Sequence, residues 1–111
     1  MLFCIMGQYT PQAVGANLDD ASTDREAAVK KLMDAAGARL VAMYGYIAEG
    51  PGVMVIFEVA DPSVAAAITA VAVAGGALQN VRHLRLETQQ GVADVRKKAR
   101  QIRGAYKAPG K

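Results

Sequence analysis

The sequence is poor in the residue types on which many functional sites depend. Among its 111 residues there is no tryptophan, and cysteine and histidine occur once each, as Cys4 and His83. A single cysteine excludes a disulfide within the chain, which fits a protein of a reducing cytoplasm. A zinc or iron site would have to rely on carboxylates, and the sequence has no metal-ligand spacing, phosphate-binding loop or nucleotide-binding fingerprint. We therefore expect neither a metal nor an organic cofactor.

Long apolar segments are also missing. The longest uncharged stretch, residues 62–81, is interrupted by a glycine pair and contains Thr69, Gln79 and Asn80, so we do not expect it to span a membrane. The opening residues MLFCIMGQYT have no charged region and no cleavage site, which is unlike a signal peptide. These features predict a soluble, cytoplasmic protein.

The residues that are present predict one globular domain with an uneven charge. Hydrophobic residues make up 52% of the chain and charged residues 21%, a balance typical of folded proteins. Residues 96–111 hold seven of the thirteen Lys and Arg residues and no acid. Residues 1–95 carry six basic and ten acidic residues, a formal charge of −4. An anionic partner would therefore be expected at the C-terminal tail.

Capping residues and apolar patterns predict alternating strands and helices. Helices are expected to begin after Thr10, at a capping box formed by Thr23 and Glu26, after Asp61 and after Thr88. The expected strands are residues 2–9, 39–48, 53–59 and 81–88. The order βαββαβ followed by a helix predicts an α+β domain over residues 1–88, with an antiparallel sheet and helices on one face. Residues 89–111 are expected to form a basic amphipathic helix and a flexible tail.

Two apolar surfaces predict that the chain associates with itself. Residues 2–8 and 53–59 are apolar on both faces of their expected strands, although helices are expected on one face only. Residues 64–78 contain no charge anywhere around the expected helix. A homodimer or larger assembly, with sheets packed face to face, would cover these surfaces. The alternative is that the C-terminal segment folds back over the sheet.

The sequence resembles the GYD-domain family over residues 1–88. The resemblance is carried by FCIMGQYTPQAV, by AAGARLVAMY and by EGPGVMVIFEVADPSVAAAI. It implies a ferredoxin-like fold of the dimeric α+β barrel class. The Gly-Tyr-Asp turn for which the family is named reads Gly50-Pro51-Gly52 here, so the functions of those Tyr and Asp side chains are not expected. We expect a structural type II turn, with a positive φ at Gly52.

The expected fourth strand carries a row of polar side chains. His83, Arg85 and Glu87 alternate with Leu84 and Leu86, so the polar residues share one face of the strand. Imidazole is the usual acid-base group near neutral pH, which makes His83 the candidate catalytic residue. Arg85 is the candidate clamp for an anionic substrate group. The alternative is a row of polar side chains that is solvated or lies at the edge of an interface.

Three tyrosines are candidate ligand-binding residues. Tyr9 ends the first expected strand, and Tyr44 and Tyr46 share one face of the second. Their hydroxyls are expected to converge on a cavity between sheet and helices, although ordinary packing at the sheet edge is an alternative. Related barrel families include oxygenases, cyclases, isomerases and ligand-binding proteins. From these residues, and by analogy of fold alone, we expect binding of a small apolar or aromatic molecule, either by a cofactor-independent enzyme or by a binding protein.

The basic C-terminal segment predicts a second class of function. One expected helix carries Arg96, Lys97, Arg100 and Arg103, whose cations could dock an acidic partner protein or a membrane surface. Aromatic residues are not interleaved among them apart from Tyr106, so nucleic-acid binding is not expected. The alternative is a basic helix face exposed to solvent.

Overall fold

The computed structural model describes residues 1–110 of the chain as four strands and four α-helices. The strands are β1 (Leu2–Tyr9), β2 (Arg39–Tyr46), β3 (Gly52–Glu58) and β4 (Leu78–Leu86). The helices are α1 (Pro11–Asp19), α2 (Arg25–Ala36), α3 (Pro62–Ala74) and α4 (Gln89–Ile102), the last followed by a 3₁₀ turn at Arg103–Ala105.

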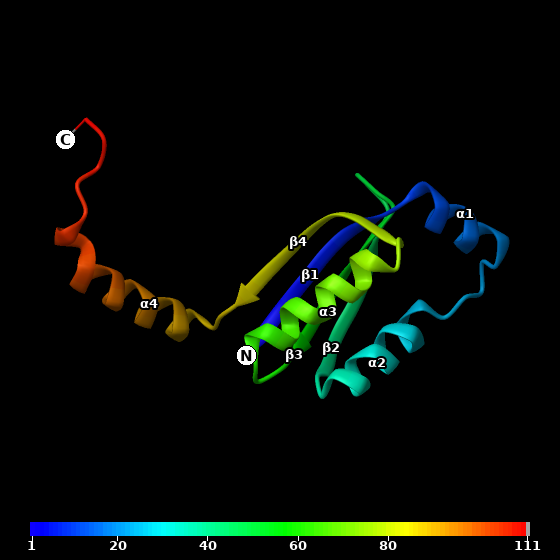
Figure 1. Ribbon diagram of the computed structural model, residues 1–111, viewed down its shortest axis with the longest axis horizontal. Helices are drawn as coiled ribbons and strands as arrows, with labels where there is room; N and C mark the ends of the chain where they lie inside the picture. The colour runs from blue at the N-terminus through cyan, green and yellow to red at the C-terminus, as the bar shows by residue number, and fades with distance from the viewer. Residues whose placement is uncertain (111) are drawn as a thin grey trace.

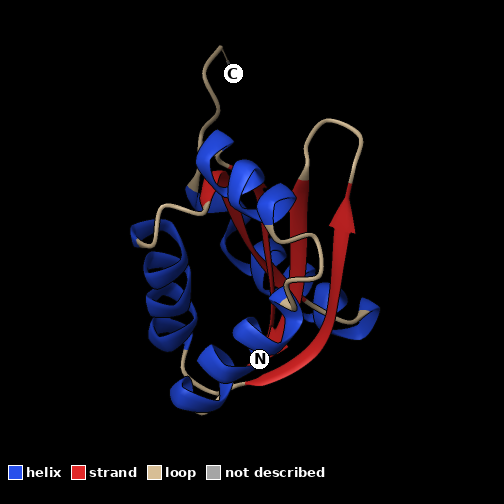
Figure 2. Cartoon of the chain, turned by 90° about the vertical axis from the view of Figure 1, so that its right-hand side faces the viewer, coloured by secondary structure: helices blue, strands red, loops and turns tan. Residues whose placement is uncertain are grey.

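The strands form one antiparallel sheet in the order β2-β3-β1-β4. Figure 1 shows α2 and α3 against one face of this sheet, while α4 leads away from the end of β4. The turn of the β2–β3 hairpin stands clear of the helices (Figure 2). This arrangement confirms the predicted ferredoxin-like α+β fold.

The core lies between α2, α3 and the two central strands. Alternate residues of β1 and β3 face the helices, because successive side chains of a strand point to opposite faces. The buried residues that form this core are Phe3, Ile5, Met33, Val53, Val55, Phe57, Val59, Ala65 and Ile68. Phe57 and Met33 are the largest fully buried side chains. Removing either side chain would therefore leave a cavity at the centre of the packing.

The observed helix caps agree with three of the four predictions. Thr10, Asp61 and Thr88 accept hydrogen bonds from backbone N–H groups in the first turns of α1, α3 and α4. The predicted capping box at Thr23 is wrong, since Asp24 caps α2 by accepting the N–H of Ala27 at 2.9 Å. Hydrogen bonding from Thr23 and Ser22 instead holds the pKa of Asp20 below its ordinary value. Thr23 therefore stabilises the preceding turn.

The turn between β2 and β3 also differs from the prediction. Gly52 does not have a positive φ; it is a buried residue at the start of β3, and Glu49 has the positive φ in this turn. The absence of a side chain at Gly52 has a different cause. A Cβ atom there would overlap the ring of Tyr46, which lies opposite in the register. Close packing, and not turn type, requires this glycine.

Strand β4 begins at Leu78, earlier than predicted. Leu78 and Gln79 pair with Tyr9 and Gln8, and the register then shifts opposite Met6–Gln8. Asn80, at φ 52°, lies in this irregular segment. A β-bulge therefore extends pairing past the point where the apolar pattern breaks.

The second face of the sheet carries apolar side chains that α2 and α3 do not cover. We call this surface the open face; its apolar residues are Leu2, Cys4, Met6, Ala42, Met54, Ile56, Leu84 and Leu86. Cys4 is buried among them, and burial raises the pKa of its thiol, which keeps the thiol neutral. No residue of α4 is buried, and Val95 and Ile102 on its apolar side are 58% and 71% exposed. Two apolar surfaces therefore lie uncovered in the single chain.

Candidate functional site

A cavity of about 250 Å³ lies between the sheet and the two covering helices. We call it the inner cavity. Strands β1 and β3 supply Ile5, Val53 and Val55 to its wall. The helices and loops supply Ala28, Val29, Leu32, Met33, Ile68, Val71, Ala72, Gly75 and Ala77. Met43 and Leu78 come from the outer strands, and Tyr9 and Arg25 are the two polar side chains in the wall. Its size and lining suit an apolar molecule of one or two rings.

A second hollow of about 240 Å³ adjoins the inner cavity. We call it the outer hollow. It shares Tyr9, Arg25, Gly75 and Ala77 with the inner cavity. Its remaining lining residues are Gln12, Ala13, Ala16, Asn17 and Gly76. Tyr9 and Arg25 therefore stand where an apolar space meets a polar one.

Arg25 is a site residue that the sequence analysis missed. It is the exposed first residue of α2 and was not among the residues predicted to form a site. The helical spacing contained a usable signal, because Arg25 is three and seven residues from Ala28 and Leu32, which also line the inner cavity. A long cation on the apolar side of an amphipathic helix is a candidate for the rim of a pocket.

The structure places His83 beside the inner cavity's helix wall but not in the cavity lining. Its ring lies edge-on to Phe3, with centroids 5.3 Å apart, and its Nδ1 atom is 2.7 Å from Oγ1 of Thr69. The Thr69 hydroxyl donates to the carbonyl of Ala65 at 3.2 Å. Nδ1 of His83 either donates to this hydroxyl or accepts from it, depending on the tautomer, and Nε2 makes no hydrogen bond within residues 1–110. His83 is thus oriented by α3 with its free nitrogen away from Thr69.

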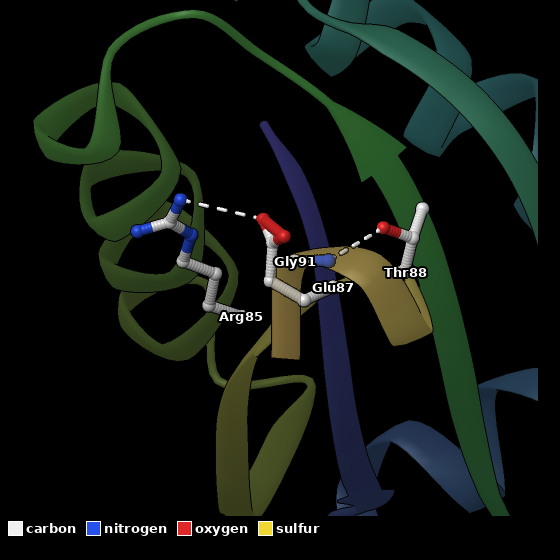
Figure 3. Close-up of polar contacts among 4 residues, drawn as sticks. All are labelled: Arg85, Glu87, Thr88 and Gly91. Carbon is white, nitrogen blue, oxygen red and sulfur yellow. Dashed lines mark hydrogen bonds and ion pairs between the residues drawn. The ribbon is translucent and has the colours of Figure 1, made fainter. Parts of the chain in front are cut away.

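Arg85 and Glu87 form an ion pair at the end of β4, with Arg85 Nη2 3.4 Å from Glu87 Oε1. Figure 3 shows Arg85 directed toward Glu87, next to the Thr88 side chain that accepts the N–H of Gly91 at 3.0 Å. A Cβ atom at Gly91 would overlap the Glu87 carboxylate, so this glycine lets the acid lie against the start of α4. Arg85 lines neither the inner cavity nor the outer hollow. Its charge is engaged within the chain.

The three tyrosines do not converge. Tyr9 lines the inner cavity, whereas Tyr44 and Tyr46 lie opposite Met54 and Gly52 on the open face. The cause is a register shift between Leu40 and Ala42. Leu40 packs against the core, so an unbroken alternation would have pointed residues 42, 44 and 46 toward the helices as well. The extra residue at this bulge turns both tyrosines to the other face.

Tyr46 contributes instead to a third hollow of about 400 Å³ on the open face. The other residues that line it are Met6, Gln8, Ala48, Glu49, Met54, Asn80 and Arg82. The Gln8 amide is fixed there, since it donates to the Glu49 carbonyl at 2.8 Å and accepts from Asn80 at 2.9 Å. These bonds join the hairpin turn to β1 and β4.

The candidate docking residues Arg96, Lys97, Arg100 and Arg103 are all exposed. The first three lie on α4, and Arg103 begins the 3₁₀ turn that follows it. Within residues 1–110 the two ion pairs are Arg39 with Glu58 and Arg85 with Glu87, so none of these four cations is paired.

Over residues 1–110, no group of three or more His, Cys, Asp or Glu side chains is arranged to hold a metal ion. Over the same residues, no helix has the length and hydropathy needed to cross a membrane.

Comparison with solved structures finds proteins of distantly similar structure. One is 5-chloro-2-hydroxyhydroquinone dehydrochlorinase (TftG) from Burkholderia phenoliruptrix AC1100, solved in complex with 2,5-dihydroxybenzoquinone. It is 15% identical, with a TM-score of 0.57 over 82% of this chain and 98% of its own. Another is Atu4242 from Agrobacterium tumefaciens, 12% identical with a TM-score of 0.47 over 80% of this chain and 95% of its own.

Comparison of the sequence with known families gives a more direct result. No curated protein sequence matches the chain. The GYD domain, however, matches residues 3–95, a range that runs from β1 into α4 and includes both α2 and α3. The match covers most of the chain and confirms the resemblance seen in the sequence, so this protein belongs to the GYD domain family.

Proposed function

We propose that this protein binds a small apolar or aromatic molecule in the inner cavity. The observation that carries the proposal is the cavity's composition, a largely apolar wall with polar side chains at one end. Such sites bind the apolar part of a ligand by excluding water and orient it with a few polar groups. TftG, which shares the fold, was solved with a small ring compound, and this supports the proposal by analogy of fold.

The arrangement of polar groups favours binding over catalysis as the proposed activity. Tyr9 and Arg25 can hold and orient a ligand, but neither is an ordinary proton acceptor at neutral pH. His83 has a free Nε2 atom but lies outside the cavity lining. An oxygenase, isomerase or cyclase reaction would require the ligand to extend to His83 or to supply its own base.

A cavity-filling variant tests the proposed binding site. Ala72 lines the inner cavity on α3, and Ala72→Phe would place a phenyl ring in a space of about 250 Å³. We expect this variant to bind 2-acetylnaphthalene at least about tenfold more weakly than the wild type, measured by ligand-observed NMR titration. Ala70→Phe is the matched control, since Ala70 is exposed on the same helix and outside the cavity. Equal affinity of both variants and the wild type would contradict the proposal.

We further propose that two copies pair through their open faces. The support is an apolar sheet surface that α2 and α3 leave uncovered, with Met54 and Ile56 only partly buried in the single chain. Burial of such a surface is favourable by about 25 cal/mol per Å² of apolar area. A homodimer with a two-fold axis is the simplest closed assembly that covers it.

The exposed basic helix supports a second candidate function, docking of an acidic partner protein. The observation that favours it is α4, whose apolar side is uncovered and whose cations have no ion-pair partner in residues 1–110. Replacing Arg96, Lys97, Arg100 and Arg103 by Gln keeps helical propensity while removing four charges. Electrostatic docking should then be lost, and in the wild type it should weaken steeply with salt. Capture of an acidic peptide that responds to neither change would exclude this function.

A further inference from the structure

The inner cavity and the outer hollow form one site with two chemically different parts. The inner part is apolar, and the outer part adds the side-chain amides of Gln12 and Asn17. Tyr9 and Arg25 line both parts and so lie at the junction. A ligand that filled the apolar part would present any polar substituent to these two side chains.

Arg25 is the charged side chain at this junction, and its charge is not compensated there. No acidic residue lines either part of the site, and neither ion pair within residues 1–110 includes Arg25. The preceding acid, Asp24, accepts the N–H of Ala27 as the cap of α2. A ligand anion bound at the junction would therefore meet a guanidinium that no protein carboxylate already occupies.

Helix stability does not account for an arginine at this position. Arg25 is the first residue of α2, where the helix dipole disfavours a cation and favours an acid. The Tyr9 hydroxyl likewise makes no hydrogen bond within residues 1–110, although the backbone N–H of Tyr9 donates to the carbonyl of Pro51. Both side chains thus retain donors for a ligand.

We infer that the ligand of this site is a compact apolar or aromatic carboxylate, whose anionic group is bound by Arg25 and Tyr9 at the mouth of the inner cavity. This inference rests on the proposed function, because it assigns the chemical class of the molecule bound in the same cavity. The planar guanidinium matches a carboxylate with two parallel N–H···O hydrogen bonds, and the phenol adds a third donor. The inner cavity holds the ring.

Arg25 would then be the anion clamp, in place of the Arg85 expected from the sequence. Arg85 lies outside both parts of the site and is paired with Glu87. Arg25 supplies a guanidinium at the rim of the cavity, a role that the sequence had predicted for Arg85. Anion recognition is thereby moved from β4 to the start of α2.

Two probes of nearly equal shape test the charge preference. The anionic probe is 2-naphthoate and the neutral probe is 2-acetylnaphthalene, each titrated into wild type, Arg25→Gln and Lys30→Gln by ligand-observed NMR. Lys30→Gln is the matched control, since it removes one cation from the same helix at an exposed position outside the site. Circular dichroism checks folding, and Arg25→Gln is expected to be as stable as the wild type because it removes a cation from a helix start.

The wild type is expected to bind 2-naphthoate more tightly than the neutral probe. Arg25→Gln should weaken 2-naphthoate binding at least about fivefold and leave the neutral probe within about twofold. Lys30→Gln should change neither affinity by more than about twofold. Two results would overturn this inference and leave the proposed function standing. One is that the wild type binds the neutral probe at least as tightly as 2-naphthoate, and the other is that Arg25→Gln weakens the binding of both probes equally. Failure of both probes to bind the wild type would overturn both.

Discussion

Gly52 and Tyr46 show how a single contact determines a residue type in this fold. The two residues are opposite each other at the end of the β2–β3 hairpin, and the ring of Tyr46 occupies the space that a Gly52 side chain would need. The backbone of Gly52 lies in a strand, so an alanine would be acceptable in conformation but not in volume.

We predict that Gly52→Ala destabilises the protein by about 1–3 kcal/mol, because the Tyr46 ring must move. The matched control is Gly15→Ala in α1, where a Cβ atom would meet no atom within 4 Å. Alanine is favoured over glycine in a helix by about 1 kcal/mol, so this control should be neutral or stabilising. Urea unfolding measures both values. An equal response of the two variants would contradict the assigned contact.

The Asp61 carboxylate makes the stability of the fold depend on pH. It accepts hydrogen bonds from the N–H and hydroxyl of Ser63, both at 2.8 Å, which lower its pKa. Because the pKa of Asp61 is lower in the folded protein, its carboxylate contributes fully to stability when the pH is above its ordinary pKa of about 3.9. This contribution is lost as the pH falls through the pKa of the folded state. Asp61→Asn keeps a cap without the titrating group, so its stability should fall less than that of the wild type below about pH 4. Thermal unfolding at pH 7 and pH 3 makes the comparison, and parallel losses would contradict it.

At the scale of elements, successive side chains of β3 point to opposite faces of the sheet and so lie in two different environments. Val55 faces the helices in the core, whereas its neighbour Ile56 faces the open side. We predict that Val55→Glu unfolds the protein, since an unpaired charge in the core costs about 3 kcal/mol or more of a total near 5–15 kcal/mol. Ile56→Glu should remain folded by circular dichroism. Equal loss of structure in both variants would show that the two faces are not distinct.

Local patterns in the sequence predicted the helices and strands, but they did not predict for every strand which residues face the helices. Thr10, Asp61 and Thr88 identify helix starts because capping is a contact within a few residues of chain. The bulges in β2 and β4 depend on partner strands distant in sequence, and periodicity along one strand does not contain that information. For this reason the sequence did not show that Tyr44 and Tyr46 lie away from the cavity that Tyr9 lines. Arg25 was not predicted, since the site that it lines is formed together with residues distant in sequence, such as Tyr9 and Gly75.

At the scale of the whole molecule, the open face predicts the state of assembly. The wild type should be a dimer at micromolar concentration, because its uncovered sheet is apolar. Ile56→Glu should be a folded monomer. Pairing of two such chains would bring two carboxylates together across the two-fold axis, where they would repel each other and be removed from water. Multi-angle light scattering gives the masses directly. A monomeric wild type would contradict sheet pairing, and a dimeric Ile56→Glu variant would move the interface elsewhere.

The central claim is that a small apolar ligand enters the space between sheet and helices, and its location is the quantity to measure. Methyl NMR of the labelled protein, titrated with 2-acetylnaphthalene, reports both faces of the sheet in one experiment. The account predicts ring-current shifts at Val29, Leu32 and Ile68, which line the inner cavity. It predicts unchanged methyl signals at Ile56 and Leu84 on the open face. Shifts confined to Ile56 and Leu84, with no response from the cavity methyls, would contradict it.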